Sequence, residues 1–220
     1  MIEAKGLVKI FKTAKSAVTA LDDIDININA GDFAIIKGPS GCGKSTLLFS
    51  LGGLLQPSAG AVRISGREIY SLAENERLTF RSKKIGFVFQ SYYLLPYLSV
   101  IENILIVNRV SGIRVTNDKI LDLAKGLDFY HRLGHKPSEL SIGEKQRVCL
   151  ARALVVKPEV IFADEPTGNL DPGNAEVVLK HFDQFRQRNG TVVMVTHGAD
   201  ADQFATKQFK MNTGKIKEIN

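Results

Sequence analysis

The residues best suited to chemistry lie in a glycine-rich run that ends in a lysine and two hydroxyl side chains. The run is Gly38-Pro39-Ser40-Gly41-Cys42-Gly43-Lys44-Ser45-Thr46. Glycines let backbone N–H groups turn inward around phosphate oxygens, and a helix that begins after them adds its partial positive charge. Lys44 would then reach the β and γ oxygens of a nucleotide, and Ser45 would offer its hydroxyl to Mg²⁺. An incidental turn is the alternative, but an apolar strand before the run and a helix after it favour a phosphate-binding loop.

Two adjacent carboxylates form a second candidate site. Asp164 and Glu165 come directly after the apolar run 160–163 and are followed by Pro166. Asp164 could hold Mg²⁺ directly or through water, and Glu165 could orient and deprotonate the water that attacks a γ-phosphate. A solvated acidic turn is the alternative for a lone pair of this kind, but it is weak beside a phosphate-binding loop. The pair predicts hydrolysis of the bound nucleotide.

A third motif is a helix start. It reads Leu140-Ser141-Ile142-Gly143-Glu144-Lys145-Gln146, and the amphipathic pattern continues through Arg152. Ser141 stands where an N-cap would satisfy free backbone N–H groups. Taken alone, the motif predicts only a well-capped helix.

The elements that would position these groups follow from hydrophobic periodicity. Alternation over 24–28 predicts a half-buried strand in an N-terminal antiparallel β region, and the short apolar run 33–37 predicts another strand. Leucines at helical spacing predict a helix over 44–55, which completes a strand, loop and helix unit. From 73 to about 133 the pattern turns helical, and apolar strands return at 160–163 and 191–195. The sequence therefore predicts an α/β core interrupted by a helical lobe.

Composition limits the class of protein. The 220 residues are 44% apolar and 24% charged, which is typical of one globular domain with a sizeable core. The net charge of +6 suits polyphosphates, anionic membranes or nucleic acid, and equally an ordinary solvated surface. Cys42 and Cys149, the two cysteines, form neither a disulfide framework nor a metal cluster, so we expect a reducing cytosol. The charged N-terminus and the lack of long apolar stretches predict neither export nor a membrane span.

The motifs taken together resemble the ATPases of ABC transporters over essentially the whole chain. The resemblance rests on the phosphate-binding loop, the helix start with Ser141 and Gly143, and the Asp164-Glu165 pair. It also includes a glutamine after an apolar strand (Phe87-Val88-Phe89-Gln90), Asn169-Leu170-Asp171, and His197 after a strand. The segments 164–171 and 94–103 are similar to those of one branch, the ATPases of lipoprotein release, macrolide export and the cell-division ABC complex.

The resemblance implies a fold and an organisation. The fold is of the α/β class, a P-loop NTPase with an ABC-type α/β core, an N-terminal antiparallel β subdomain and an inserted α-helical signature subdomain. Residues 1–220 form one ABC ATPase domain, with the core at about 1–90 and 158–220 and the helical subdomain at about 91–157.

The resemblance also implies roles for single residues. The catalytic residues are Glu165, His197, Lys44 and Gln90, and the ligands of Mg²⁺ are Ser45, Gln90 and Asp164. The residues that bind ATP are Phe11, which would stack on adenine, the loop residues Gly38, Pro39, Ser40, Gly41, Cys42, Gly43, Lys44, Ser45 and Thr46, and Ser141 and Gly143, which would bind the nucleotide of a second subunit. A core phenylalanine is the alternative for Phe11. Asp171 matches the loop that lines the interface between the two subunits.

The implied function is that of a Mg-dependent ATPase subunit of an ABC transporter, which dimerises around two ATP molecules and drives conformational change in separate membrane subunits. One phosphate-binding loop and one signature in the chain require a second ATPase subunit, with a homodimer expected. Export or extraction, and a cytoplasmic position on the inner face of the cell membrane, follow from the branch. An ATP-switched regulator that transports nothing is the alternative. A nucleic-acid ATPase is less favoured, and no nucleic acid is expected, because the chain has neither a long coiled-coil insertion nor two ATPase halves.

Two residues depart from the family's usual LSGGQ. Ile142 replaces a glycine and could crowd the close approach of backbone to phosphate, and Glu144 places a carboxylate within reach of an anion. Because the other groups are present, we expect activity to be retained, at a normal or a reduced rate.

Two further expectations concern accessibility. The apolar segment 92–106 either receives a short helix from the membrane subunit or is core of the helical lobe. Alkylation of Cys42 in the phosphate-binding loop is expected to lower ATPase activity, unless the thiol is inert.

Overall fold

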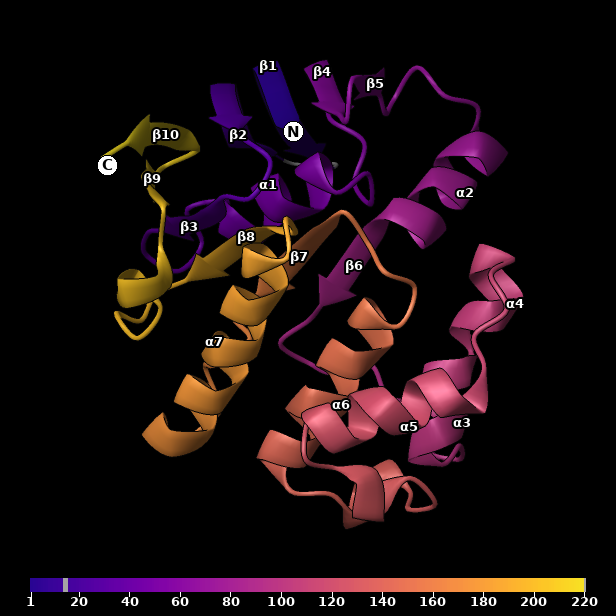
Figure 1. Cartoon of the computed structure of the whole chain (residues 1–220). Helices are drawn as coiled ribbons and strands as arrows, with labels where there is room; N and C mark the ends of the chain where they lie inside the picture. Colours follow the sequence, from indigo (N-terminus) through magenta and orange to yellow (C-terminus); the bar gives the residue numbers. More distant parts are fainter. Residues whose placement is uncertain (14–15, 220) are drawn as a thin grey trace.

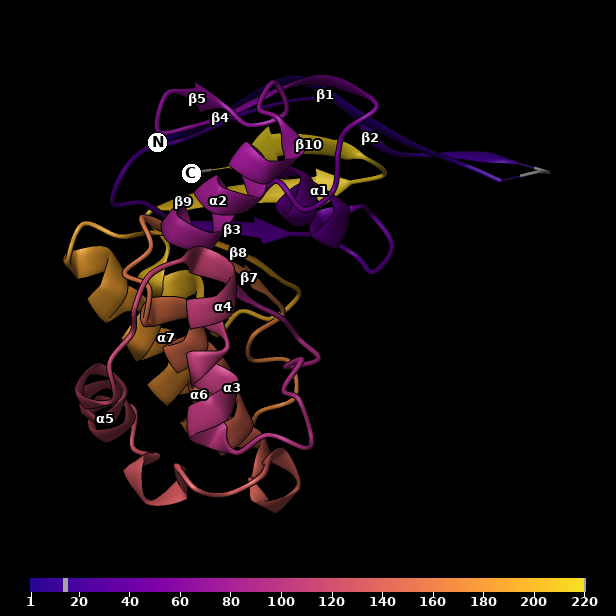
Figure 2. The same cartoon turned by 90° about the vertical axis from the view of Figure 1, so that its right-hand side faces the viewer.

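The computed structural model describes residues 1–13 and 16–219, with residues 110 and 111 described by their backbone alone. Two β-sheets form its upper part, and helices gather below and beside the larger sheet (Figures 1 and 2). The predicted α/β fold with an antiparallel β region and a helical lobe is therefore confirmed.

The larger sheet has six strands in the order β10-β9-β3-β8-β7-β6. Its inner strands read as short apolar runs because both faces of the sheet are covered. Five strands are parallel, and β10 alone runs antiparallel to β9. The strands are β3 (Phe33–Lys37), β6 (Ile85–Val88), β7 (Val160–Asp164), β8 (Thr191–Thr196), β9 (Lys207–Asn212) and β10 (Lys215–Glu218). The strands predicted at 33–37, 160–163 and 191–195 are confirmed.

The smaller sheet is antiparallel, in the order β2-β1-β4-β5. The alternation predicted at 24–28 is confirmed, because Ile24, Ile26 and Ile28 are buried while Asp25 and Asn27 are exposed. The strands are β1 (Ile2–Lys12), β2 (Ala17–Ile28), β4 (Ala59–Ile64) and β5 (Arg67–Glu68).

The first helix lies between the two sheets and packs on both. This helix is α1 (Lys44–Leu51), and Leu47, Leu48 and Leu51 bury its apolar side completely. The prediction of a helix through residue 55 is wrong at its end. Gly52 and Gly53 follow, and Gly53 adopts a left-handed conformation with φ of 72°, which glycine tolerates and a helix does not continue through.

The helix between β5 and β6 lies beside β6, and the remaining helices lie below the larger sheet (Figure 1). Strand β6 interrupts the region predicted as helical from 73 to 133, because its residues join the parallel sheet next to β7. The helices are α2 (Glu74–Lys84), α3 (Val100–Leu105), α4 (Val107–Ser111), α5 (Asn117–Gly126), α6 (Ile142–Leu154) and α7 (Pro172–Gln187). Single 3₁₀ turns lie at Tyr130–Arg132, Pro137–Glu139 and Asp202–Phe204.

The hydrophobic core lies on both faces of the larger sheet, as alternate residues of β3 demonstrate. Ala34 and Ile36 face α1 and the antiparallel sheet, whereas Phe33 and Ile35 face α7 and the helical lobe. The cluster that contains Phe33 and Ile35 includes residues of the sheet and of α3, α5 and α6. The division into a core at 1–90 and 158–220 and a helical subdomain at 91–157 stays a prediction.

No helix among residues 1–13 and 16–219 is both long enough and apolar enough to cross a lipid bilayer.

Candidate nucleotide-binding site

The parallel register of the larger sheet assembles the site. Lys37 at the end of β3 pairs with Thr196 of β8. Asp164 of β7 pairs with Val195 of β8, and Ala163 of β7 pairs with Val88 of β6. Because parallel strands end at a common edge, the loops after β3, β6, β7 and β8 leave the sheet side by side. These loops carry most of the residues that the sequence singled out: the phosphate-binding loop, Gln90, Glu165 and His197.

The phosphate-binding loop joins β3 to α1 and depends on its glycines. Gly41 and Gly43 have φ of 76° and 107°, a region that other residues rarely adopt. A Cβ on Gly43 would lie 2.4 Å from the carbonyl oxygen of Ala20, and one on Gly38 would lie 2.2 Å from that of Met211. The loop therefore rests directly on β2 and β9, while Pro39 and Ser40 at its tip are exposed.

Lys44 occupies the first position of α1 and turns its side chain back over the loop. Its Nζ donates to the carbonyl oxygens of Gly38 and Pro39 at 2.8 and 3.0 Å, and only 7% of the residue is exposed. No ion pair joins Lys44 to a carboxylate in the described part of the chain. The ammonium charge is thus held over the loop and is available to an anion.

Ser45 and Asp164 bring two oxygens together beside the loop. The Ser45 hydroxyl donates to Asp164 Oδ1 at 2.9 Å. Burial raises the pKa of the Asp164 carboxyl against the hydrogen bond from Ser45, and the charge of Glu165 adds to the rise. Within the described residues, no group of three or more His, Cys, Asp or Glu side chains could hold a metal. The hydroxyl and the carboxylate are hard oxygen donors that fit Mg²⁺ when phosphate and water complete the coordination.

Glu165 stands at the end of β7 in a left-handed conformation, with φ of 47°. Its backbone N–H donates to the carbonyl oxygen of Val195 at 3.0 Å, which fixes the residue against β8. Its carboxylate Oε2 lies 2.5 Å from Nδ1 of His197, whose side chain is 66% exposed. The pair is a carboxylate held by an imidazole at the mouth of the site, an arrangement suited to accepting a proton.

Gln90 reaches the same place from β6. A methyl group on Gly168 would lie 3.8 Å from both Gln90 Nε2 and Glu165 Oε2, so the two side chains converge over that glycine. The structure thus brings Lys44, Ser45, Gln90, Asp164, Glu165 and His197 to one edge of the sheet.

Sequence reasoning missed how the loop after Gln90 is held. Tyr92 and Tyr93 both have left-handed backbones, with φ of 59° and 47°, which is strained for tyrosine. Arg152 on α6 donates to their two carbonyl oxygens at 2.6 and 2.7 Å, and the Cys149 thiol also donates to Tyr92 O, at 3.2 Å. Nothing in the spacing of the sequence distinguishes this arginine from others on an amphipathic helix.

Ser141 and Gly143 lie apart from the phosphate-binding loop. Ser141 caps α6, as predicted, and its hydroxyl accepts the backbone N–H of Glu144 at 3.2 Å. In both views α6 lies well below α1, in the helical lobe (Figures 1 and 2). One chain therefore does not bring these residues to its own phosphate-binding loop.

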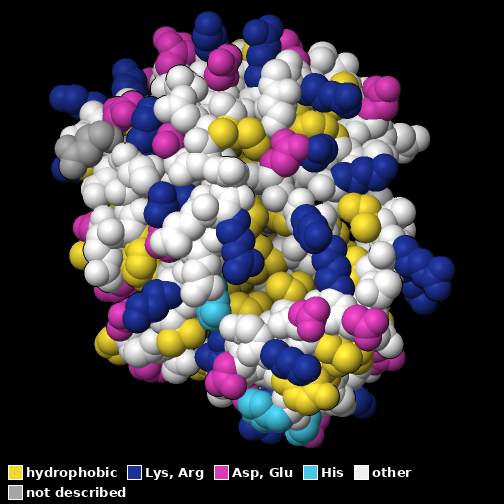
Figure 3. Space-filling view, in the orientation of Figure 1, with side chains coloured by type: hydrophobic (Ala, Val, Ile, Leu, Met, Phe, Trp, Pro, Cys, Tyr) yellow, Lys and Arg dark blue, Asp and Glu magenta, His cyan; other side chains and the backbone are white. Residues whose placement is uncertain are grey.

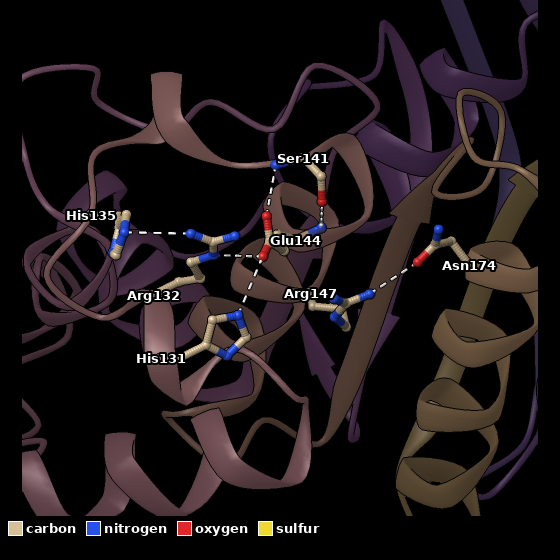
Figure 4. Close-up of polar contacts among 7 residues, drawn as sticks. All are labelled: His131, Arg132, His135, Ser141, Glu144, Arg147 and Asn174. Carbon is tan, nitrogen blue, oxygen red and sulfur yellow. Dashed lines mark hydrogen bonds and ion pairs between the residues drawn. The ribbon is translucent and has the colours of Figure 1, made fainter.

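Gly143 of α6 lies against Asn174 of α7, whose hydrogen bond with Arg147 is drawn in Figure 4. A Cβ there would lie 2.6 Å from Asn174 Oδ1, so a glycine is needed for the approach. Asn174 accepts from Arg147 at 3.1 Å and donates from its Nδ2 to Asp171 at 2.6 Å. Asn174, which the sequence did not single out, thus connects the signature helix to Asp171.

The structure corrects the expectation for Glu144. Its carboxylate turns into the lobe, where it accepts from Arg132 Nε at 2.8 Å and from the Ser141 backbone N–H at 2.7 Å, with His131 at 3.6 Å (Figure 4). Burial alone would raise the pKa of Glu144, but these hydrogen bonds and the Arg132 charge lower it to about 2. The negative charge of Glu144 is therefore compensated inside the lobe. Ile142 is 49% exposed at the start of α6, and its effect on phosphate stays a prediction.

Phe11 lies on β1 and is 41% exposed, with Lys9 Nζ 5.2 Å from its ring centroid. The alternative of a core phenylalanine is therefore wrong, and an exposed ring remains open to stacking on a base.

Cys42 is only 6% exposed and belongs to the core cluster beneath the loop. Its Sγ would lie 2.7 Å from a Cβ on Gly38, so the thiol points under the loop and not into the site. This placement favours the inert alternative, and we expect alkylation to be slow in the folded protein.

Comparison with known proteins accords with this geometry. Residues 21–168 match the family model described as ABC transporter. An uncharacterized ABC transporter ATP-binding protein of Methanocaldococcus jannaschii is 42% identical over 100% of this chain and 99% of its own length. The lipoprotein-releasing system ATP-binding protein LolD of Bacteroides thetaiotaomicron is 41% identical over 99% of this chain and 100% of its own. The macrolide export ATP-binding/permease protein MacB of Chlorobaculum tepidum is 38% identical over 98% of this chain, which spans 33% of that longer protein.

Two solved structures have the same fold. A dimeric bacterial ABC transporter cassette superposes with a TM-score of 0.94 at 33% identity, covering 100% of this chain and 98% of its own. The same cassette in a dimeric post-hydrolysis state, bound to ADP and phosphate, gives 0.93 at 32% identity with the same coverage.

Proposed function

The chain belongs to the ABC transporter family, and from that premise we propose that it is the Mg-dependent ATPase subunit that powers separate membrane subunits. The observation that supports this most is the common sheet edge, where Lys44, the Ser45–Asp164 pair and the Glu165–His197 pair come together. Each group has the charge and position that hydrolysis of a nucleoside triphosphate needs.

Binding of ATP would begin at the phosphate-binding loop. Backbone N–H groups and the N-terminus of α1 attract the phosphates, and Lys44 exchanges its carbonyl partners for phosphate oxygens. Phe11 offers an exposed ring to the adenine. The ammonium ion needs no large movement, because it already lies over the loop.

Ser45, Asp164 and Gln90 would hold Mg²⁺. The ion would supply positive charge against the phosphates, which favours the departure of ADP. Asp164 must be ionised for this role, and the hydrogen bond from Ser45 favours the ionised form.

Glu165 would accept the proton of the attacking water. His197 holds one carboxylate oxygen and leaves the carboxylate oriented, and Gln90 approaches the same place from β6. His197 and Gln90 position Glu165 from two different strands, so a change in the loop after Gln90 would alter the position of the attacking water.

A second cassette would complete the site. Ser141 and Gly143 lie at the N-terminus of α6, away from their own phosphate-binding loop, and a helix N-terminus favours an anion. In a dimer of two such chains, the α6 of one would face the nucleotide of the other. Two of the solved cassette structures similar to this chain are dimeric.

The membrane subunits would dock beside the loop after Gln90. A mostly apolar groove of about 410 Å³ opens there between β6, α6 and the start of α4, and Phe87, Phe89 and Tyr93 line it. The stacked rings of Phe87 and Phe89 and the edge contact of Tyr93 on Phe89 connect this groove to Phe162 of β7. We therefore infer a position at the inner face of the cell membrane, held by the membrane subunits.

Export or extraction is the favoured direction, because LolD and MacB relatives are named for lipoprotein release and macrolide export. An ATP-switched regulator without transport is the second candidate.

The test compares Mg-ATP hydrolysis by the purified chain and by Glu165→Gln, with size-exclusion chromatography of both in ATP. Loss of the general base should lower the rate by about 10² to 10⁴ and leave an ATP-bound dimer. The matched control Glu3→Gln, an exposed carboxylate on β1, should hydrolyse ATP as the wild type does. Equal rates for the wild type and Glu165→Gln would refute the assigned role. Omitting Mg²⁺ tests the metal separately.

A further inference from the structure

A groove crosses the face of the molecule shown in Figure 3, between α7 and the α5–α6 part of the lobe. It encloses about 730 Å³ and lies at the C-terminal ends of α6 and α7. Ser141 and Asp171 cap the opposite ends of the same helices. Because the 13 residues of α6 span about 20 Å, the groove is separate from both the nucleotide and the cassette interface.

The floor of the groove is apolar. Leu123 comes from α5 and Leu127 follows that helix. The end of α6 and the turn after it contribute Leu154 and Pro158, and α7 contributes Phe185. Figure 3 shows this floor as a hydrophobic hollow in the middle of the face, with Lys and Arg side chains on both sides. An open apolar floor is stabilised when apolar groups cover it.

Positive charge stands on both banks of the groove. Lys119 and Lys157 line one bank, and Arg188 lines the α7 bank beside His181, whose pKa is lowered by burial. Asp122 is the one carboxylate among the lining residues. Within residues 1–13 and 16–219, no ion pair engages Lys119, Lys157 or Arg188. The groove therefore presents three cations and one carboxylate around an apolar floor.

Helix ends account for two of these cations. Lys157 follows the C-terminus of α6 and Arg188 follows that of α7, where positive charge interacts favourably with the helix dipole. Lys119 has no such explanation, because it lies in the first turn of α5, where the dipole disfavours a cation. Burial lowers the pKa of Lys119, and the charge of Lys157 lowers it further. A negative group in the groove would offset the unfavourable helix dipole at Lys119 and the repulsion from Lys157, and would compensate the buried charge of Lys119.

We propose that this groove binds an acidic, amphipathic peptide segment of a partner protein. Its apolar side chains would cover the floor, and its carboxylates would pair with Lys119, Lys157 and Arg188. A peptide fits better than a small anion because the charges stand on two banks with apolar surface between them, the pattern that an amphipathic helix matches. The occupant would contact α5 and α7 together, and so would couple the lobe to the sheet. The proposal does not depend on the ATPase activity.

The first experiment measures binding of the full chain to fluorescein-labelled helical peptides by anisotropy. One set carries a leucine stripe flanked by glutamates, and the matched set carries lysines in their place. The acidic set should bind, less tightly at higher salt, and the basic set should not. The double variant Lys119→Glu with Lys157→Glu should bind the acidic set at least about tenfold more weakly and gain affinity for the basic set. Lys210→Glu with Lys217→Glu, exposed on β9 and β10, is the matched control and should bind as the wild type does.

The second experiment locates the peptide by cysteine protection. Cys42 and Cys149 are buried, so Gln184→Cys on the exposed α7 bank provides one reactive thiol. The acidic peptide should slow its alkylation and leave that of Asn212→Cys on β9 unchanged. ATP hydrolysis by the charge-reversed variant, without peptide, should equal that of the wild type, which also demonstrates folding.

Three results would overturn the proposal. They are no binding by any acidic peptide, binding that the groove reversal leaves unchanged, and binding of anionic lipid vesicles, with the same sensitivity to reversal, in place of the peptides. If the reversed variant hydrolyses ATP normally but no peptide binds the wild type, the groove proposal fails while the ATPase proposal stands.

Discussion

The sheet edge and the signature end, which is the start of α6, both carry residues of the proposed ATP site but are built in different ways. At the sheet edge, the register of the strands sets the position of each group. The loop to Lys44 follows β3, Asp164 ends β7, and His197 follows β8. At the start of α6, side chains do the positioning: Arg132 holds Glu144, and Asn174 packs on Gly143. The sheet edge can therefore lose a side chain and keep its shape, whereas the signature end cannot.

The sharpest test of this difference is Lys44→Ala. The variant removes an ammonium ion from the loop but no strand pairing, so ATP affinity should fall by about 100-fold while the midpoint of thermal unfolding without nucleotide changes by only a few degrees. Isothermal titration calorimetry and thermal unfolding measure the two quantities. A large loss of stability would mean that the loop lysine is also a structural support.

The signature end should respond to acid through Glu144. Its pKa in the folded protein, about 2, lies below its ordinary value of 4.5. The stabilisation is therefore complete above about pH 4.5 and is lost as the pH falls through about 2, by at most about 3 kcal/mol. Urea unfolding should find Glu144→Gln less stable than the wild type at pH 6, with the gap closing towards low pH. A gap that is the same at all pH values would contradict the ionic role of Glu144.

Gly143→Ala should disturb the contact between α6 and α7. A Cβ at 2.6 Å from Asn174 Oδ1 forces that side chain to move, at a cost of about 1–3 kcal/mol in unfolding free energy. ATP affinity of the single chain should not change, because the phosphate-binding loop is remote. The second substitution Asn174→Ala should recover part of the loss in a double-mutant cycle. Additive losses would show that Asn174 does not cause the strain.

Arg152→Lys should have the smallest effect, because it joins the two regions without belonging to either site. Lysine keeps the charge but loses the paired donors to Tyr92 and Tyr93, so the strained loop after Gln90 should loosen. We expect the kcat of ATP hydrolysis to fall about threefold with KM unchanged. Arg63→Lys on β4 is the control for an exposed arginine. An increased KM with unchanged kcat would place the effect on nucleotide binding.

Local signals made the sheet edge predictable from sequence. The phosphate-binding loop, its strand and its helix are contiguous, and Asp164 and Glu165 follow their strand directly. The alternation in β2 and the capping by Ser141 likewise depend on neighbours within a few residues.

Contacts between distant segments were not predictable. No residue near Glu144 in the sequence indicates that Arg132 will neutralise its charge. Gly143 contacts Asn174 only because α6 and α7 pack against each other there. Strand β6 was expected from the resemblance, as the apolar strand before Gln90, but periodicity alone assigned its surroundings to helices because the strand is short. The end of α1 depended on the backbone of Gly53, which leucine spacing does not report.

The phosphate-binding loop near residue 40 is backed by residues near the end of the chain. Met211 lies against Gly38. The Gly214 N–H donates to Cys42 O at 3.0 Å, and the Gly214 carbonyl oxygen accepts from the Asp22 N–H. During synthesis the loop emerges well before the residues that support it, and contacts between distant segments form slowly. A nascent chain consequently cannot complete the support of its phosphate-binding loop until residues 211–214 have emerged, so we expect products truncated before β9 to bind ATP poorly.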